Sequence, residues 1–333
     1  MSQQESKVSA QSGETRGTAL MIGNFDGCHL GHQRLAAATI ALGRELGLTT
    51  LALTFRPRPD LFFSGRHDDP GSRLLTAPQQ LRAFAELGID VCVAKKFDKE
   101  FSQLTHEEFH DRVLRQELQA AAIIVGADFR FGAGRSGDAT WLKDRAARDG
   151  LRCTIVPPIV SAGSVVSSSR IRTLLRDSGD VRGVAELLGR PWLLEGRVVS
   201  GRKLGRTIGF PTINLSDVQQ LVPRSGVYAA VAVISGGRFG LRDALVMGLP
   251  DGTVGAAVSI GTNPTVDASS SIKIEAHLLE SFGPDELYGL NVGIYLLDRV
   301  RDEMRFSEVD ELRRQIAADV TAVQGLCNVS RST

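Results

Sequence analysis

Hydrophobic positions in the first half of the chain alternate between short runs and a helical spacing. The run over 18–22 is apolar and ends at Gly23, and apolar residues then recur at helical intervals from Leu35 to Leu46. A second apolar run over 50–55 follows. The same alternation continues with predicted helices over 78–87 and 107–118 and predicted strands over 91–94 and 121–125. This order predicts an α/β domain of the Rossmann-like kind, with a doubly wound parallel sheet.

The pattern changes after Pro191, where short β-like stretches are separated by Gly, Pro and Asp turns. These stretches cover residues 195–199, 226–235, 244–247, 253–260, 272–279 and 292–297. Helical periodicity returns only over 309–323. Several short strands followed by one helix predict a small antiparallel β-barrel with a C-terminal helix.

The change of hydrophobic pattern after Pro191 implies two domains, and a length of 333 residues also favours two. We expect a disordered tail over 1–16, a first domain over 17–182 and a second over 188–325. A short predicted helix over 182–188 marks the boundary.

Charge and cysteine usage exclude several classes of protein. Lys and Arg number 39 against 38 for Asp and Glu, so the net charge of +1 favours neither nucleic acid nor an anionic membrane as a partner. The apolar runs are far shorter than the ~20 residues that span a bilayer. The four cysteines (Cys28, Cys92, Cys153 and Cys327) lie too far apart for a zinc knuckle or a redox dithiol. These features predict a cytoplasmic, reduced protein.

Three short motifs match known signatures but lack the required context. The segment HEEFH over 106–110 has zinc-protease spacing, yet Thr105 and Glu108 also form a capping box that opens a helix. The G-x-G-x-x-G match over 132–137 does not join a strand directly to a helix. The segment over 201–207 lacks the Gly-Lys-Ser/Thr ending of a Walker loop. We therefore expect neither zinc nor NAD.

The segment GNFDGCHLGH over 23–32 is stronger evidence for a functional site, because it lies where a strand ends and a helix begins. A helix N-terminus offers unpaired N–H groups to a phosphate, and Gly27 and Gly31 allow a close backbone approach. His29 and His32 are three residues apart and can face the same ligand. They suit stabilisation of charge on a phosphate. The alternative is an ordinary pair of capping or surface histidines.

A second anion-binding edge is predicted at SSSRIR over 167–172, just before another helix. Hydroxyl and N–H groups at a helix start, with Arg172 one turn in, suit a phosphate, although such starts are often plain caps. Together the two segments predict a two-sided clamp on a triphosphate.

These two segments resemble the signature of the nucleotidyltransferase superfamily. Further motifs narrow the resemblance and occur in this order: TFRPRP, FDKEFSQLTHEEF, VGADFRFGAGRSGD, GRKLGRTIGFPTINL, SGVYAA, IGTNPT and IEAHLLE followed by DELYG. Over about residues 17 to 325, the chain is similar to the bacterial bifunctional riboflavin kinase/FMN adenylyltransferase family, also called FAD synthetases.

The resemblance implies that the first domain transfers AMP from ATP to FMN, giving FAD and pyrophosphate. His29 and His32 match the catalytic histidines of the family. The matched ATP-binding positions are Gly23, Phe25, Asp26, Gly27, His29, His32, Ser168, Ser169 and Arg172. The flavin-binding positions are Phe63, Asp128 and Phe131. For the two phenylalanines, plain core packing stays an alternative.

The resemblance also implies that the second domain phosphorylates riboflavin with ATP, releasing ADP. Thr212 and Asn214 match the positions that hold Mg²⁺, and Glu275 matches the catalytic general base. The matched ATP-binding positions are Gly201, Gly205, Thr207, Thr212 and Asn214. Riboflavin, FMN, FAD, ATP, ADP and pyrophosphate are thus the expected partners, and the oligomeric state is open.

The chain departs from the family pattern chiefly at Arg56 and Arg58, where Asp and His are common. Milder departures occur at Val165, Ser169, Ile213 and Glu280. Two cations beside a phosphate site are expected to tighten substrate binding or to alter which nucleotide or flavin fits. One alternative is therefore a riboflavin kinase whose adenylyltransferase half uses another acceptor or a flavin analogue. The other is a flavin-binding regulator or store without turnover.

Overall fold

The computed structural model describes residues 17–66, 70–201, 204–234, 253–262, 272–280, 282 and 286–332. The expected tail over 1–16 and the expected strand over 244–247 lie outside these residues. The chain divides into two compact units, Met1–Asp69 with Ala77–Val166 and Pro70–Thr76 with Ser167–Thr333. The expected domain limits, 17–182 and 188–325, concern which pieces fold independently and stay predictions.

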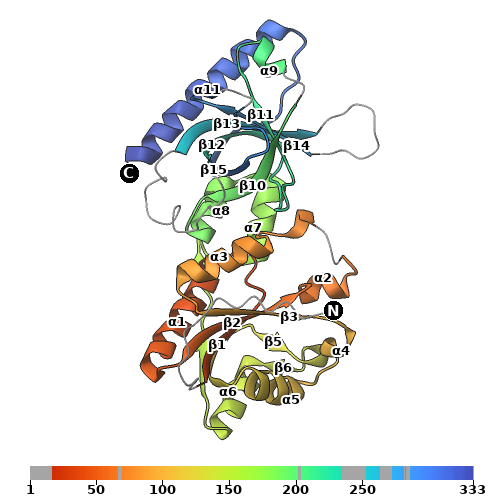
Figure 1. Cartoon of the computed structure of the whole chain (residues 1–333), viewed down its shortest axis with the longest axis vertical. Coiled ribbons are helices and arrows are strands. Elements are labelled where there is room, and N and C mark those ends of the chain that lie inside the picture. Colours follow the sequence, from red (N-terminus) through yellow and green to blue (C-terminus); the bar gives the residue numbers. More distant parts are fainter. Residues whose placement is uncertain are drawn as a thin grey trace. The chain divides into compact units, whose positions relative to one another are not determined.

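A five-stranded parallel sheet forms the centre of the first unit (Figure 1). Its strands are β1 (Thr18–Ile22), β2 (Thr49–Arg56), β3 (Val91–Lys96), β4 (Ala120–Gly126) and β7 (Arg152–Val156). The order is β3-β2-β1-β4-β7, so the chain runs outward from β1 and then returns to the other side of β1. This confirms the doubly wound sheet and places its switch point between β1 and β4, where ligands bind in such folds.

Short helices and hairpins surround this sheet. The helices are α1 (Leu30–Leu46), α2 (Pro59–Phe63), α3 (Ala77–Leu87), α4 (Lys99–Ser102), α5 (His106–Glu108), η3 (Ala133–Arg135) and α6 (Ala139–Arg148). The hairpin strands are β5 (Arg130–Phe131), β6 (Gly137–Asp138), β8 (Val160–Ser161) and β9 (Ser164–Val165). Helix α1 buries Leu35 and Leu42 and ends at Gly47, whose φ of 65° suits glycine.

The helix expected over 107–118 differs in type from an ordinary α-helix. After the single turn of α5, the chain continues as a π-helix, η2 (Phe109–Glu117), and Leu118 N–H donates to the Val113 carbonyl. The wider turn still buries Phe109, Val113 and Leu114 on one face. Apolar spacing located this face but does not distinguish a π-helix from an α-helix over so few turns.

The second unit begins with a helical segment and continues as a barrel (Figure 1). The helices are η1 (Pro70–Ser72), α7 (Ser168–Thr173), η4 (Leu174–Ser178), α8 (Val181–Leu188), α9 (Leu204–Thr207) and α11 (Val309–Ser332). The strands are β10 (Trp192–Val199), β11 (Ile213–Ser216), β12 (Gly226–Val233), β13 (Thr253–Thr262), β14 (Ile272–Leu278) and β15 (Asn291–Arg301).

The six strands close into a barrel in the order β10-β11-β14-β13-β12-β15, and the pairs are antiparallel. The expected antiparallel barrel with a C-terminal helix is therefore confirmed. Strand β12 is buried along its whole length, although strands of a small barrel usually expose alternate residues. Its Ala229 and Val231 pack against Val323 and Cys327 of α11, so this helix covers the outer face of β12.

Candidate active sites

The loop over 23–29 connects β1 to α1 at the carboxyl end of β1, beside the switch point of the sheet. Phe25 and Cys28 adopt left-handed conformations, with φ of 49° and 44°, which non-glycine residues rarely take. Strained backbone of this kind persists where the surroundings enforce it, often at functional sites. The loop is therefore a tightly shaped turn that leads into the start of α1.

The rings of His29 and His32 lie stacked, with centroids 3.6 Å apart and planes 19° from parallel. The predicted pairing of the two histidines on one side of the loop is thus present. His29 is the residue before α1, and its side chain does not cap the helix. A Cβ at Gly31 would lie 3.1 Å from His29 Cε1, which explains glycine at this position. The two imidazoles form one unit at the helix N-terminus.

Burial, and secondarily the neighbouring His29, hold the pKa of His32 well below its usual value of 6.5. The His32 ring is therefore neutral near pH 7 and donates through a single N–H. Its Nδ1 atom is buried and has no hydrogen-bond partner within the described part of the chain. A buried polar atom of this kind favours a ligand that completes the hydrogen bond.

The Arg58 guanidinium is bound to protein carboxylates. It forms an ion pair and hydrogen bond with Asp26 of the β1–α1 loop, and it donates to Asp60 over 3.1 and 2.9 Å. The side chains of Arg58 and Asp26 are 13% and 7% exposed. Arg58 was expected to act on a substrate phosphate, but its guanidinium group binds carboxylates of the loop and of α2 instead.

Arg56 is linked to the same loop through a glutamine. Its Nη2 donates to Gln80 Oε1 over 3.3 Å, and Gln80 Nε2 donates to the Asn24 carbonyl over 2.9 Å. Both arginines of the unusual TFRPRP segment therefore support the loop over 23–29. Their most direct effect is on the position of this loop.

Replacing Arg58 by methionine is expected to slow the AMP transfer to FMN that the family resemblance implies by about tenfold or more, because Asp26 loses a largely buried charge partner. FMN formation should not change. The double variant Asp26→Asn/Arg58→Met should recover part of the loss, and steady-state rates of the three variants give the coupling. Strict additivity of the two single effects would contradict a positioning pair.

Ser168, Ser169 and Arg172 lie in the second unit, at α7. The residue before them, Ser167, caps α7 by accepting a hydrogen bond from Arg170 N–H over 3.2 Å. Arg172 Nε donates to the Ser72 carbonyl over 2.8 Å. The helix start is as expected, and the assignment of these residues to a triphosphate stays a prediction.

The three expected flavin residues differ in exposure. Phe63 ends α2 and is 71% exposed, Asp128 is exposed in the turn after β4, and Phe131 is only 7% exposed. Phe131 stacks on Phe129 and belongs to the core of the first unit. Of the two aromatic candidates, Phe63 therefore has the more accessible ring. A continuous series of ring contacts joins them, running Phe63, Phe97, Phe101, Phe109 and Phe131.

The barrel brings several expected kinase residues together. Asn214 on β11 is the direct cross-strand partner of Glu275 on β14. Side chains at such paired positions lie on the same face, with Cβ atoms roughly 5 Å apart. A Cβ at Gly201 would collide with the Asn214 amide, and one at Gly205 would lie 3.4 Å from Thr212 Oγ1. The two glycines therefore approach the two residues expected to hold Mg²⁺.

Thr207, the last residue of α9, follows Gly205 in the same segment. Glu275 also has a partner that the sequence reasoning missed. Lys273 Nζ lies 2.7 Å from Glu275 Oε1, and both side chains are about one-third exposed. The sequence did contain a signal for this contact. Lys273 and Glu275 are two residues apart on a strand, and this spacing places both side chains on one face.

The expected capping box of the HEEFH segment is present. Thr105 Oγ1 accepts from Glu108 N–H, and the Glu108 carboxylate accepts from Thr105 N–H. His106 Nδ1 lies 2.9 Å from Ser136 Oγ and its Nε2 lies 2.9 Å from Glu107. The segment over 132–137 forms β5, η3 and β6, and glycines 132 and 137 pack against His106.

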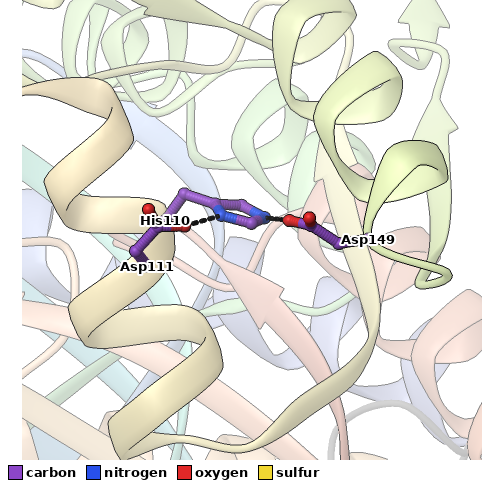
Figure 2. Close-up of side chains that lie close together, drawn as sticks. All are labelled: His110, Asp111 and Asp149. Carbon is purple, nitrogen blue, oxygen red and sulfur yellow. Dashed lines mark hydrogen bonds and ion pairs between the residues drawn. The ribbon is translucent and has the colours of Figure 1, made fainter.

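His110 lies between two carboxylates, with Asp111 at Nδ1 (2.9 Å) and Asp149 at Nε2 (3.6 Å), as Figure 2 shows. Such a trio can hold a metal ion. Here, however, Arg145 donates to both carboxylates, over 2.8 and 2.9 Å, and Arg115 lies 3.7 Å from Asp149. Two guanidinium groups already neutralise the carboxylates. The cluster therefore suits a structural tie between η2 and the end of α6 better than a cation site.

Comparisons with known proteins relate the two parts of the chain to two enzyme families. The FAD synthetase family pattern matches residues 11–170, and the riboflavin kinase family pattern matches residues 188–327. The chain is 38% identical over 304 residues to the bifunctional riboflavin kinase/FMN adenylyltransferase of Escherichia coli K12, which covers 91% of this chain and 90% of that protein. The protein of the same description from Pseudomonas fluorescens is 33% identical and covers 94% of each chain.

A solved structure has a closely similar fold. A crystal structure titled as a macrolide-efflux protein from Streptococcus pneumoniae superposes with a TM-score of 0.81 at 29% identity, covering 93% of this chain and 95% of that one. Within the part of the present chain that the structure describes, no helix has both the length and the apolar character needed to cross a membrane.

The parallel-sheet unit with its paired histidines, followed by the barrel with its Asn–Glu pair, defines a two-part transferase. The chain belongs to the bifunctional riboflavin kinase/FMN adenylyltransferase family. The resemblance stated from the sequence motifs is confirmed.

Proposed function

We propose that this chain makes FMN from riboflavin in its barrel and FAD from FMN in its first unit, with ATP as the co-substrate of both reactions. The observation that carries the proposal is the cross-strand pairing of Asn214 with Glu275, next to Thr212 and the glycines of the preceding loop. Family membership supports both activities.

In the barrel, Glu275 acts as the general base. A hydroxyl oxygen of riboflavin attacks the γ-phosphorus of ATP, its proton passes to the Glu275 carboxylate, and ADP leaves. The Lys273 ammonium holds one oxygen of that carboxylate, which orients it. Lys273 thus positions the base, while the base alone takes the proton.

Thr212 and Asn214 are the residues that would hold Mg²⁺. A hydroxyl and an amide oxygen suit a hard cation that keeps part of its water shell. Glycine at 201 and 205 lets the backbone approach these two residues closely. When bound, Mg²⁺ neutralises phosphate charge as the γ-phosphoryl group is transferred. Gly201, Gly205 and Thr207 belong to the segment that contacts these phosphates.

In the first unit, a phosphate oxygen of FMN attacks the α-phosphorus of ATP and pyrophosphate leaves. His29 and the neutral His32 donate hydrogen bonds to the phosphate oxygens as charge develops there. The N–H groups at the start of α1 add to this stabilisation. Gly23, Phe25, Asp26 and Gly27 shape the loop that presents these donors, and Ser168, Ser169 and Arg172 stay predicted ATP contacts.

The flavin of the first unit is proposed to stack on Phe63, whose ring is largely exposed. Asp128 and Phe131 stay predicted flavin residues.

The alternative of a changed acceptor rested on Arg56 and Arg58 as cations available to a substrate. Arg58 binds Asp26 and Arg56 binds Gln80, so the two arginines give no reason to propose another acceptor. The expected cytoplasmic location stays a prediction.

Incubation of the purified chain with riboflavin, ATP and Mg²⁺ tests the proposal, with the flavins separated by chromatography over time. We expect FMN to rise first and FAD to follow, because FMN is the product of one site and the substrate of the other. FMN without FAD would contradict the adenylyl-transfer half. Bound riboflavin without any product would contradict the kinase half. Bound flavin without product from either riboflavin or supplied FMN would contradict both halves and favour a flavin store.

A further inference from the structure

Strand β14 presents two different faces. Ile274, Ala276 and Leu278 are buried, whereas Lys273, Glu275 and His277 alternate with them and are partly exposed. Alternation of this kind puts the three polar side chains in one row on the same face of the strand. Glu275 is the proposed base, and His277 is the next polar residue in the same row.

His277 contacts the loop that leads to the proposed Mg²⁺ residues. Its Nδ1 lies 2.8 Å from the Pro211 carbonyl oxygen. A carbonyl oxygen only accepts, so Nδ1 carries the proton and donates. The His277 ring also meets the Phe210 ring edge to face, with centroids 5.4 Å apart. One side chain therefore holds two consecutive residues of the Gly-Phe-Pro-Thr segment.

The held segment lies just outside the regular pairing of the barrel. Strand β11 begins at Ile213, which pairs with Ala276, so Pro211 and Thr212 precede the ladder. On the other side, Phe210 N–H donates to the Gly205 carbonyl over 2.8 Å. The hydrogen bond from His277 thus fixes the backbone immediately before Thr212, at the point where the strand has not yet begun.

We infer that His277 is a positioning residue of the kinase reaction, which sets the Thr212 hydroxyl relative to Glu275. The inference rests on the proposed roles of Thr212 and Glu275. His277 itself touches neither the phosphate nor the riboflavin hydroxyl in this scheme. It acts through the Pro211 carbonyl, and because it shares β14 with Glu275, it couples the Mg²⁺ residue to the base.

Three substitutions at His277 test the inference. An asparagine amide nitrogen can replace the Nδ1 donor, a glutamine amide nitrogen reaches the Nε2 position instead, and leucine removes the donor. We expect His277→Leu and His277→Gln to lower kcat/KM for ATP in FMN formation roughly tenfold, the size that follows from losing one well-placed hydrogen bond. The Mg²⁺ concentration for half-maximal rate should rise. His277→Asn should stay within about threefold of the parent chain.

Two comparisons make the result specific. FAD formation from supplied FMN should be unchanged in all three variants, and Ile272→Ala, at an exposed position of the same strand, should leave both reactions unchanged. Thermal unfolding shows whether a variant folds, and if His277→Leu does not, the asparagine and glutamine variants decide. Equal losses in these two variants, or an unchanged kcat/KM in His277→Gln, would overturn the inference. A parent chain that makes no FMN would instead overturn the proposed function.

Discussion

Replacing Glu275 by glutamine is expected to slow FMN formation by roughly 10²–10⁴, because the amide cannot take the proton from the attacking hydroxyl. Glutamine keeps the size of the side chain, and Asn214 remains its cross-strand neighbour. FAD formation from supplied FMN should persist at the parent rate, because it takes place in the other unit. Initial rates of both reactions, measured on the same preparation, give the comparison.

The matched control is Glu308→Gln, which changes an exposed carboxylate before α11. It should leave both rates unchanged. Equal losses of FMN and FAD formation in Glu275→Gln would argue against two separate sites. A retained rate of FMN formation would remove Glu275 from the role of base and leave only its ion pair with Lys273.

Replacing His29 by alanine is expected to have the second largest effect, a fall of roughly 10²–10³ in FAD formation, the usual result of removing one donor to developing negative charge. FMN formation should be spared. Alanine also removes the ring that stacks on His32 and contributes to its low pKa. The pKa of His32, followed by NMR titration, should therefore move up towards its usual value while burial continues to lower it.

The control for this variant is Arg44→Ala, at the exposed far end of the same helix α1. Unchanged FAD formation in both variants would exclude His29 from the reaction. Loss of both reactions in His29→Ala would indicate a general folding defect, which circular dichroism can establish.

Four of the five sheet strands of the first unit were predictable because their apolar residues follow regular periods, whereas β7 and α6 were not predicted. The predicted run over 18–22 is β1, and glycine at position 47 ends α1 as a left-handed cap. The loop over 23–29, between β1 and α1, was recognisable from its glycines and histidines alone. What spacing did not reveal was the conformation of Phe25 and Cys28 or the stacking of the two rings.

Contacts between distant segments were the main features that sequence reasoning missed. Arg58 looked like a cation facing substrate, yet it binds Asp26 of a loop more than one element away. His110 lay in an apparent zinc motif, but its partners are Asp111 and Asp149. The Arg58–Asp26 ion pair and the contact of His110 with Asp149 have no local signature, because each joins residues that are distant in the sequence.

The sequence by itself determined the two-part architecture, the family and many of the strands and helices, although α6, β7 and β11 were not predicted. Each of these depends on local periodicity, on turn residues or on long motifs, which are properties of contiguous segments. Only the tertiary structure decided that Asn214 lies opposite Glu275 and that His277 holds Pro211, because strand register and barrel closure bring these residues together. Pairing across a barrel is a non-local choice, made by the packing of all six strands rather than by any one of them.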